Sequence, residues 1–277
     1  MQITMAAIRI GISPQCADSM SLKQSEAIVL RTYPLREADL LVTLFTRAEG
    51  KIKGVARAAK KSRRRFGGAL EPLTVVRAHY DDREGKELCR LDSCDILESP
   101  LSAELDYPRI VALEHIAETL DELLPDREAN DAIFRLAVAV LHQLRCGEIW
   151  MPLTYFQLWL VRLVGFLPEL GECLACGRTL NGSRAFYHAL ADGLMCEQHK
   201  RLASSQLTPE SRAVAAQMFR APVESFSGVA AIEGIESAAV SANGGGAQYA
   251  DLRRFLMQII ERHVEKKLVT VAMLTRL

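Results

Sequence analysis

The first hundred residues alternate between short apolar runs and turn-forming or charged groups. Val, Ile, Leu, Thr and aromatic residues dominate the runs, which is typical of β-strands. Groups such as READ, AEG and DDREGKE separate them and leave no room for a helix between most neighbours. The pattern predicts strands over residues 26–35, 38–46, 50–56, 73–81 and 87–99. Strands at this spacing favour a small antiparallel barrel.

After Pro100 the apolar positions recur every three or four residues, which is the spacing of amphipathic helices. Prolines stand near the starts of these stripes or in the breaks between them, where they are tolerated. The stripes predict helices over residues 110–123, 133–144, 156–164, 208–219 and 252–264. The fold class expected is therefore α+β, with a β-barrel followed by a helical domain.

The charge of the chain is balanced but unevenly distributed. The 277 residues include 34 Lys plus Arg and 34 Asp plus Glu, so the formal net charge is zero. Eight of the basic residues lie between Lys51 and Arg65, where there is no acid, and the rest of the chain therefore carries about eight negative charges. A molecule polarised in this way favours a polyanion on one side and repels it elsewhere.

The basic run leaves the third predicted strand and fills the connection to the fourth, which in a small barrel is a surface loop. Like charges in a flexible loop repel one another unless a polyanion covers them, and phosphates do so with release of counterions. No recognition helix accompanies the run, so we expect contacts that are independent of base sequence. The candidate DNA-binding residues are Lys51, Lys53, Arg57, Lys60, Lys61, Arg63, Arg64, Arg65 and Phe66.

Two other interpretations of the run stay open. It could be a solvated loop, or it could pair with residues 98–131, which hold ten acids against Arg109 and Arg127. Unpaired bases could also stack on barrel aromatics. The candidates are Tyr33, Phe45, Phe66 and Tyr80, with Phe66 favoured because it adjoins the cations, although each is also a natural core residue.

A second motif lies between the predicted helices. CLACG supplies Cys173 and Cys176, and CEQH supplies Cys196 and His199. Two pairs at this separation fit a tetrahedral Zn²⁺ site with three thiolates and one imidazole, and no open position remains for catalysis. His188 is an alternative fourth ligand with poorer spacing. We expect residues 171–200 to form a zinc-binding module whose role is structural, while the other cysteines are buried or incidental thiols.

Motifs for bond chemistry are missing from the sequence. There is no phosphate-binding loop for a nucleotide, no H-E-x-x-H and no G-x-S-x-G, so we expect that the protein is not an enzyme. The most apolar segment, residues 151–168, is too short and too polar to span a membrane. Residues 1–20 resemble neither a signal peptide nor folded structure, and we interpret them as a disordered extension of a cytoplasmic protein.

The order of these features resembles the RecO family of bacterial recombination and repair mediators. The resemblance rests on the stretch from EAIVLRTYPLREADLL through EGK and the basic loop to GALEP, on FQLWLVRLVGFLPEL, and on CLACG. It extends from about Leu22 to the last helix, so it covers most of the chain.

The resemblance implies an N-terminal OB-fold over residues 21–100, and a helical domain over 101–277 that contains the zinc module. RecO-like proteins bind single- and double-stranded DNA, anneal complementary strands, and interact with RecR and with the single-stranded DNA-binding protein to load the RecA recombinase. The acidic, phenylalanine-ended tail of that partner would dock on the helical domain, where Arg162 beside Trp159 is a conceivable contact. The rival interpretations are a zinc-containing adaptor that binds RNA or another polyanion and, less favoured, a nuclease.

Overall fold

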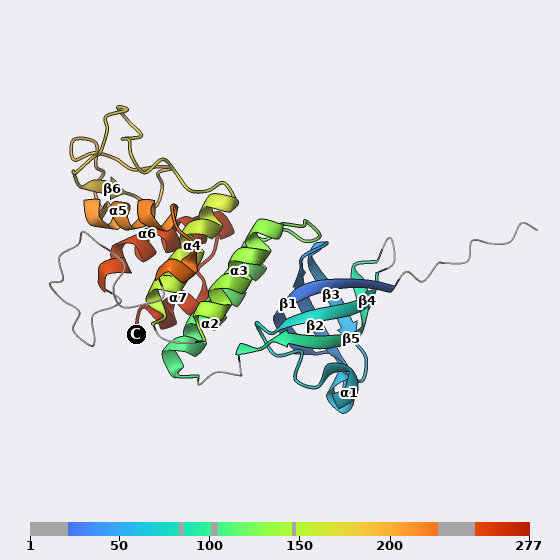
Figure 1. Ribbon diagram of the computed structural model, residues 1–277. Coiled ribbons are helices and arrows are strands. Elements are labelled where there is room, and N and C mark those ends of the chain that lie inside the picture. Colours follow the sequence, from blue (N-terminus) through green and yellow to red (C-terminus); the bar gives the residue numbers. More distant parts are fainter. Residues whose placement is uncertain (1–21, 83–85, 101–104, 146–147, 227–246) are drawn as a thin grey trace, which may run out of the picture.

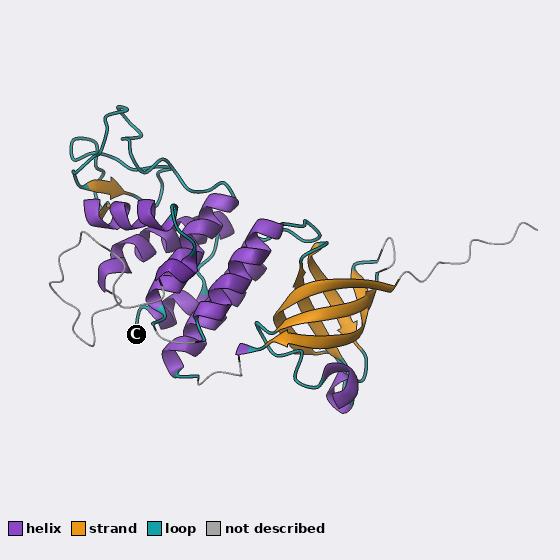
Figure 2. Cartoon of the chain, viewed as in Figure 1, coloured by secondary structure: helices purple, strands orange, loops and turns teal. Residues whose placement is uncertain are grey.

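The computed structural model describes residues 22–82, 86–100, 105–145, 148–226 and 247–277. The extension expected over residues 1–20 lies outside the described residues. Figure 1 shows a β-barrel on one side and a group of helices on the other, and Figure 2 shows that, apart from one short pair, the strands belong to the barrel. The α+β fold predicted from the sequence is confirmed.

The barrel closes with the strand order β1-β2-β3-β5-β4, in which β1 pairs with both β2 and β4. Its strands are β1 (Leu22–Pro34), β2 (Leu40–Thr46), β3 (Gly50–Ala56), β4 (Val75–Asp81) and β5 (Leu88–Glu98). The pair β3–β5 is parallel and the other neighbours are antiparallel, so the barrel is not wholly antiparallel as the spacing had suggested. A five-stranded barrel with this connectivity is an OB-fold.

Alternation along the strands separates the inside of the barrel from its outer face. Val42 and Leu44 of β2 and Ile52 and Ala56 of β3 are buried in the barrel core. Because side chains alternate along a strand, the residues directly next to each of these in sequence point outward. Phe45 points outward and is nevertheless fully buried, since it packs on the helical domain.

Short helical turns fill the connection between β3 and β4. A 3₁₀ turn, η1 (Ala59–Lys61), is followed by the single-turn helix α1 (Arg63–Phe66). In Figure 1, α1 lies at the lower end of the barrel, away from the helices of the second domain. The basic run is therefore a folded turn rather than a flexible loop.

The helical domain is built around one buried helix. Its helices are α2 (Tyr107–Leu123), α3 (Asp131–Gln143), α4 (Trp150–Leu163), α5 (Pro209–Met218), α6 (Ala247–Val264) and α7 (Val269–Leu274), with the 3₁₀ turn η3 (Val223–Phe226). Leu153, Phe156 and Leu160 of α4 are completely buried, because α3 and α6 pack against this helix. Among the described helices, none combines the length and apolarity that crossing a bilayer requires.

Polar side chains begin several of these helices as the sequence suggests. The side chains of Asp106, Asn130 and Thr208 each accept a hydrogen bond from the backbone N–H three residues later, at the starts of α2, α3 and α5. Helix α7 begins differently, since its backbone N–H groups donate to Glu118 of α2. The sequence pattern did not predict α7.

Between α4 and α5 the chain forms a small module with little regular structure. Its strands β6 (Ala185–Tyr187) and β7 (Ser205–Leu207) pair antiparallel. Tyr187 packs edge-on against Phe255 of α6, with ring centroids 4.9 Å apart. The module is thus an insertion that rests on the helical domain.

The barrel and the helices meet through an apolar contact surrounded by ion pairs. The ring centroids of Phe45 and Phe134 lie 5.8 Å apart. Arg31 donates to Asp121 over 2.6 Å, and Arg47 donates to Asp131 over 2.6 Å. Charged pairs across an interface favour one orientation of its two sides, so these pairs contribute to how the barrel and the helices are oriented.

Gly50 brings the backbone of the barrel close to the backbone of the helical domain. It has φ +72°, and a Cβ atom placed on it would lie 2.0 Å from the carbonyl oxygen of Glu128. Only glycine fits both this conformation and this space. The turn between β2 and β3 therefore sits directly on the chain that connects α2 to α3.

Candidate nucleic-acid interface and metal centre

The connection that contains η1 and α1 is held on the barrel by hydrogen bonds from its backbone N–H groups and by one buried side chain. The N–H of Lys60 donates to the carbonyl of Ala38 over 3.1 Å, and the N–H of Ala58 donates to Asp39 Oδ1 over 2.8 Å. Phe66 is 3% exposed and packs in the barrel core. These contacts fix the turn, so the cations between them are presented on an ordered scaffold.

Lys51 and Lys53 form ion pairs with the helical domain, although Lys53 remains exposed. The ammonium of Lys51 lies 3.3 Å from Asp126 and donates to the carbonyl of Asp121, and only 10% of its side chain is exposed. Lys53 lies 3.6 Å from the other oxygen of Asp126. Pairing with the acidic helical segment, an alternative that the sequence left open, therefore holds for these two lysines.

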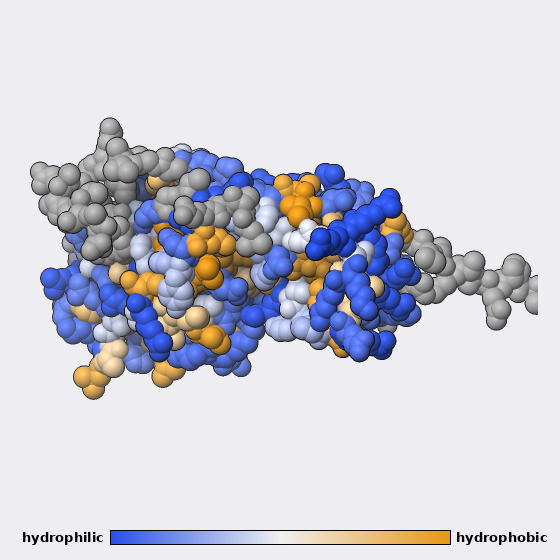
Figure 3. All heavy atoms as spheres, turned by 90° about the horizontal axis from the view of Figure 1, so that it is seen from below, coloured by the Kyte–Doolittle hydropathy of each residue, from blue (hydrophilic) through white to orange (hydrophobic). Residues whose placement is uncertain are grey.

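The middle of the run behaves differently. The side chains of Arg57, Lys60, Lys61, Arg63 and Arg64 form no ion pair with any carboxylate in the part of the chain that the structure describes, and all are exposed. We call these five residues the basic turn. Seen from below in Figure 3, the surface of the barrel is mostly hydrophilic. Uncompensated charge on an ordered turn is a suitable contact for phosphates.

Arg65 supports the turn from beneath. Its guanidinium donates to the carbonyl of Arg57 over 2.7 Å and to that of Asp92 over 3.4 Å. It also lies over the ring of Phe66, 5.0 Å from the centroid. The guanidinium of Arg65 is therefore hydrogen-bonded to backbone carbonyls, and its positive charge lies close to those of the neighbouring cations.

The aromatic candidates of the barrel divide by exposure. Phe45, Phe66 and Tyr80 are at most 3% exposed, whereas Tyr33 is 50% exposed. A base cannot stack on a ring inside a core, so the structure does not support the favoured role of Phe66. Its apolar side chain anchors the basic turn instead.

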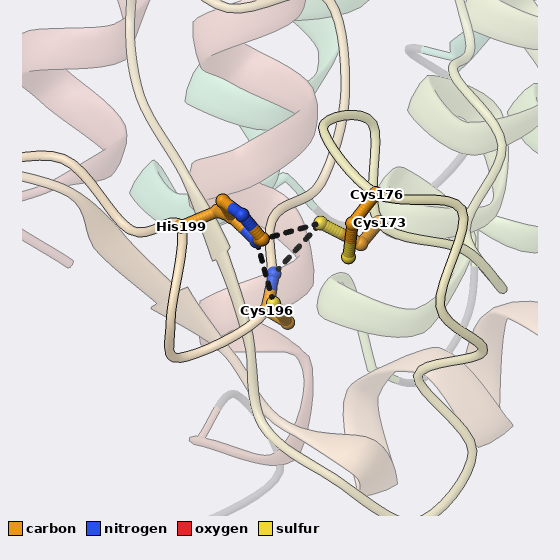
Figure 4. Close-up of side chains that lie close together, drawn as sticks. All are labelled: Cys173, Cys176, Cys196 and His199. Carbon is orange, nitrogen blue, oxygen red and sulfur yellow. Dashed lines mark hydrogen bonds between the residues drawn. The ribbon is translucent and has the colours of Figure 1, made fainter.

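The metal-ligand candidates converge on one point of the module, as Figure 4 shows. One ligand atom from each of Cys173, Cys176, Cys196 and His199 lies within 4.8 Å of the others. The Nδ1 atom of His199 is 3.2 Å from Cys196 Sγ and 3.9 Å from Cys173 Sγ. Ligands about 2.0–2.3 Å from a tetrahedral Zn²⁺ are separated by roughly 3.5–3.8 Å, so the cluster has the size of a zinc site.

The backbone around the cluster forms a tight knuckle. The N–H of Gly177 donates to the carbonyl of Cys173 over 2.8 Å, and Gly177 itself has φ +66°. Burial opposes ionisation of Cys173, but hydrogen bonds from the backbone N–H groups of Cys196, Ala175 and Cys176 prevail and lower the pKa of this thiol. A thiolate stabilised in this way is suited to bind a metal ion.

His188 is not part of the cluster. Its Nδ1 atom accepts a hydrogen bond from the backbone N–H of Leu190 over 3.1 Å. Cys89 and Cys94 are also separate, because both lie in the barrel, where burial raises the pKa of each thiol to about 12. The described cysteines thus divide into candidate metal ligands and core thiols.

A groove lies between the module and helices α4 and α5. Its volume is about 730 Å³, and Arg162, Leu167, Pro168 and Phe219 line part of it. The guanidinium of Arg162 lies 4.3 Å from the ring centroid of Phe219 and 5.3 Å from that of Trp159. The sequence suggested the proximity of Arg162 and Trp159 but not Phe219, which comes from a separate helix end.

The fold and the site define a class of protein: an OB-fold barrel with a basic turn, joined to a helical domain that carries a Cys₃His module. Comparison with known proteins agrees with this class. Residues 20–100 match the family model "Recombination protein O N terminal", and residues 104–271 match "Recombination protein O C terminal". The chain belongs to the RecO family.

Individual relatives carry the name DNA repair protein RecO. The one from Koribacter versatilis is 67% identical over 256 residues, which cover 92% of this chain and 99% of the relative. The one from Geobacter sulfurreducens is 37% identical over 179 residues, which cover 62% of this chain and 70% of that protein. The one from Anaeromyxobacter sp. strain K is 36% identical over 170 residues, which cover 61% of this chain and 67% of that protein.

Proposed function

We propose that this protein is a recombination mediator in DNA repair that binds single- and double-stranded DNA without sequence specificity and promotes the annealing of complementary strands. The observation that carries the proposal is the basic turn, with five exposed cations and no carboxylate partner among the described residues. The similarity to proteins named DNA repair protein RecO supports the same role.

Electrostatics explains how such a surface would promote annealing. Two strands repel each other through their phosphates, and the range of this repulsion is set by ionic screening. A cationic turn that contacts both backbones lowers the barrier, and base pairing itself supplies the specificity. No covalent step is needed, so the proposal assigns no catalytic residue and no nucleotide cofactor.

The Cys₃His cluster has a structural role in this proposal. Cys173, Cys176, Cys196 and His199 would hold Zn²⁺ with all four positions filled by protein ligands. The ion would supply folding free energy to a module that has only two short strands of its own.

Partner proteins complete the proposed role. We propose that the protein acts with RecR and with the single-stranded DNA-binding protein to load RecA onto gapped DNA in the bacterial cytoplasm. The groove beside Arg162 suits the acidic, phenylalanine-ended tail of the single-stranded DNA-binding protein. Arg162 is exposed and offers positive charge, and Leu167, Pro168 and Phe219 offer apolar surface to an aromatic end.

Fluorescence polarisation with a labelled peptide of that tail tests the dock. Arg162→Ala should weaken binding at least tenfold, because a charged hydrogen bond in a groove is worth about 1.5–3 kcal/mol. Arg178→Ala, an exposed arginine of the module away from the groove lining, should bind as the wild type does. Equal affinity of Arg162→Ala and the wild type would remove this groove as the dock.

Annealing tests the main proposal. We define the turn variant, in which glutamine replaces Lys60, Lys61, Arg63 and Arg64. The control variant removes the same number of exposed charges from the helical domain by placing glutamine at Arg178, Arg184, Arg201 and Arg276.

Complementary strands coated with single-stranded DNA-binding protein are mixed with each protein, and duplex formation is timed. The wild type and the control variant should accelerate annealing, and the turn variant should not. Equal acceleration by the turn variant would contradict the proposal. Acceleration restricted to RNA strands would favour the adaptor interpretation, and strand cleavage in the presence of Mg²⁺ would favour a nuclease.

A further inference from the structure

Tyr33 is the exposed member of the aromatic candidates on the barrel. It lies near the end of β1 and pairs with Leu41 of β2, which pairs in turn with Val55 of β3. Val42, Gly54 and Thr32 form the next row, and Val42 is in the barrel core. Because side chains alternate along strands, Tyr33, Leu41 and Val55 form a row on the outer face.

The helical domain covers only part of this face. Phe45 and Lys51, which lie opposite each other on β2 and β3, are buried against the helices. Further along the same strands, Leu41 and Val55 are only half-buried, and Tyr33 is 50% exposed. The outer face of the first three strands is therefore closed at one end and open at the other.

The open end adjoins the basic turn. Arg57 follows β3 directly, two residues after Val55. The N–H of Lys60 donates to the carbonyl of Ala38, which lies in the connection between β1 and β2 just past Tyr33. A strand whose phosphates contact the basic turn would thus have its bases within reach of an exposed aromatic ring.

We propose that Tyr33 is a base-stacking residue that gives this protein a higher affinity for unpaired strands than the basic turn alone provides. The strand 2–3 face and the β1–β2 loop are where OB-fold barrels bind oligonucleotides. An exposed ring stacks on the face of any base, whereas the bases of a duplex have no free face. The proposal rests on the proposed DNA-binding function and adds discrimination between single and double strands.

The test compares Tyr33→Ala, Tyr33→Phe and Tyr107→Ala. Tyr107 is the matched control because it is also exposed (56%) but lies in the helical domain, at the start of α2. Asp121, the residue of α2 that contacts Arg31 of the barrel, is about 20 Å further along the helix. Affinities are measured for a single-stranded oligonucleotide and for a duplex of equal length. Stacking of unpaired bases is also followed by quenching of 2-aminopurine in the bound single strand.

Tyr33→Ala should bind the single strand roughly tenfold more weakly and leave duplex affinity unchanged. Tyr33→Phe and Tyr107→Ala should match the wild type. Unchanged single-strand affinity in Tyr33→Ala, an equal loss for both substrates, or no quenching of 2-aminopurine by the wild type would each overturn the role of Tyr33. The DNA-binding proposal would survive these results, since it fails only if wild type binds neither substrate or the turn variant binds normally.

Discussion

Lys51 and Lys60 carry the same charge in the same basic run, but their surroundings differ. Lys51 points into the junction with the helices and contacts Asp126 and Asp121, whereas Lys60 is exposed and forms no ion pair with the described residues. The first lysine is available to stabilise the fold and the second to bind a ligand.

Replacing each lysine by methionine should separate these roles. Lys51→Met should lower the free energy of unfolding by about 2 kcal/mol, because it leaves its carboxylate and carbonyl partners without their donor. Lys60→Met should change stability by less than about 0.5 kcal/mol, as is usual for an exposed position. Urea denaturation measures both. Equal stability of the two variants would show that the Lys51 contacts contribute nothing.

His115 belongs to a buried hydrogen-bond chain in the helical domain. Its side chain is fully buried, Gln157 Nε2 lies 2.8 Å from its Nε2, and its Nδ1 lies 2.8 Å from Thr270 Oγ1. Thr270 Oγ1 donates onward to Glu118 over 2.5 Å. This arrangement needs a neutral imidazole that accepts from Gln157 and donates to Thr270, and burial lowers the pKa of His115 to about 4.

A pH dependence follows from this pKa. The unfolded chain binds a proton at His115 near pH 6.5, whereas the folded chain does so only near pH 4, so stability should fall as the pH is lowered between these values. The loss should reach about 3 kcal/mol. Urea denaturation at several pH values between 7 and 4.5 gives the free energy of unfolding as a function of pH. This free energy should fall less steeply with decreasing pH in His115→Gln than in the wild type. An equal pH dependence in the variant and the wild type would exclude His115 as the origin of the effect.

At the scale of elements, periodicity predicted most of the fold. The strands and the five longer helices follow apolar patterns that the sequence displays locally. The apolar periodicity did not predict helix α7, because this helix is only six residues long and begins at contacts with Glu118, which is far away in the sequence. The separation of the basic run into paired and unpaired cations could not be predicted from the sequence either, since it depends on where Asp121 and Asp126 lie after folding.

The convergence of the candidate zinc ligands was easier to predict than the arrangement of the basic run. Their spacing is local, and a short knuckle brings each pair together without reference to the rest of the chain. The role of Phe66 could not be inferred in the same way. An aromatic residue beside cations can face the solvent or the core, and only the closed barrel shows that it faces the core.

The contact of the β2–β3 turn with the helical domain offers a test at this scale. Gly50→Ala combines an unfavourable φ of +72° with a clash against the Glu128 carbonyl, and should cost about 3 kcal/mol of stability. Gly68→Ala is the matched control, because Gly68 has φ +86° but nothing within 4 Å of an added Cβ. Its cost should be about 1–2 kcal/mol. Equal costs in thermal denaturation would mean that the junction tolerates the added methyl group.

At the scale of the whole molecule, barrel, helices and module are expected to respond separately to loss of metal. Purified protein should contain one Zn²⁺ per chain, and Cys173→Ser should contain none, whereas His188→Asn should retain it. Chelation should make the module sensitive to protease within residues 171–200, because the ion supplies much of its folding free energy. DNA binding by the barrel should persist. Metal-free wild-type protein with a protease-resistant module would contradict a structural zinc site.

The polarity of the molecule follows from the same arrangement. The basic turn stands at one end of the barrel, while Asp121 and Asp126 of the acidic segment that follows the barrel pair at the junction with Arg31, Lys51 and Lys53. A neutral chain thereby presents a cationic end to solvent. Long-range attraction of a polyanion to that end depends on ionic strength.

The salt dependence of DNA binding therefore tests the central claim most directly. The association constant of a single-stranded oligonucleotide is measured from low to physiological salt for the wild type, the turn variant and the control variant. Each phosphate contact contributes about 0.7 to the slope of log K against log salt, so the turn variant should lose roughly 2 to 3 from the slope of the wild type. The control variant should keep the slope of the wild type. A turn variant with the wild-type slope would contradict the account.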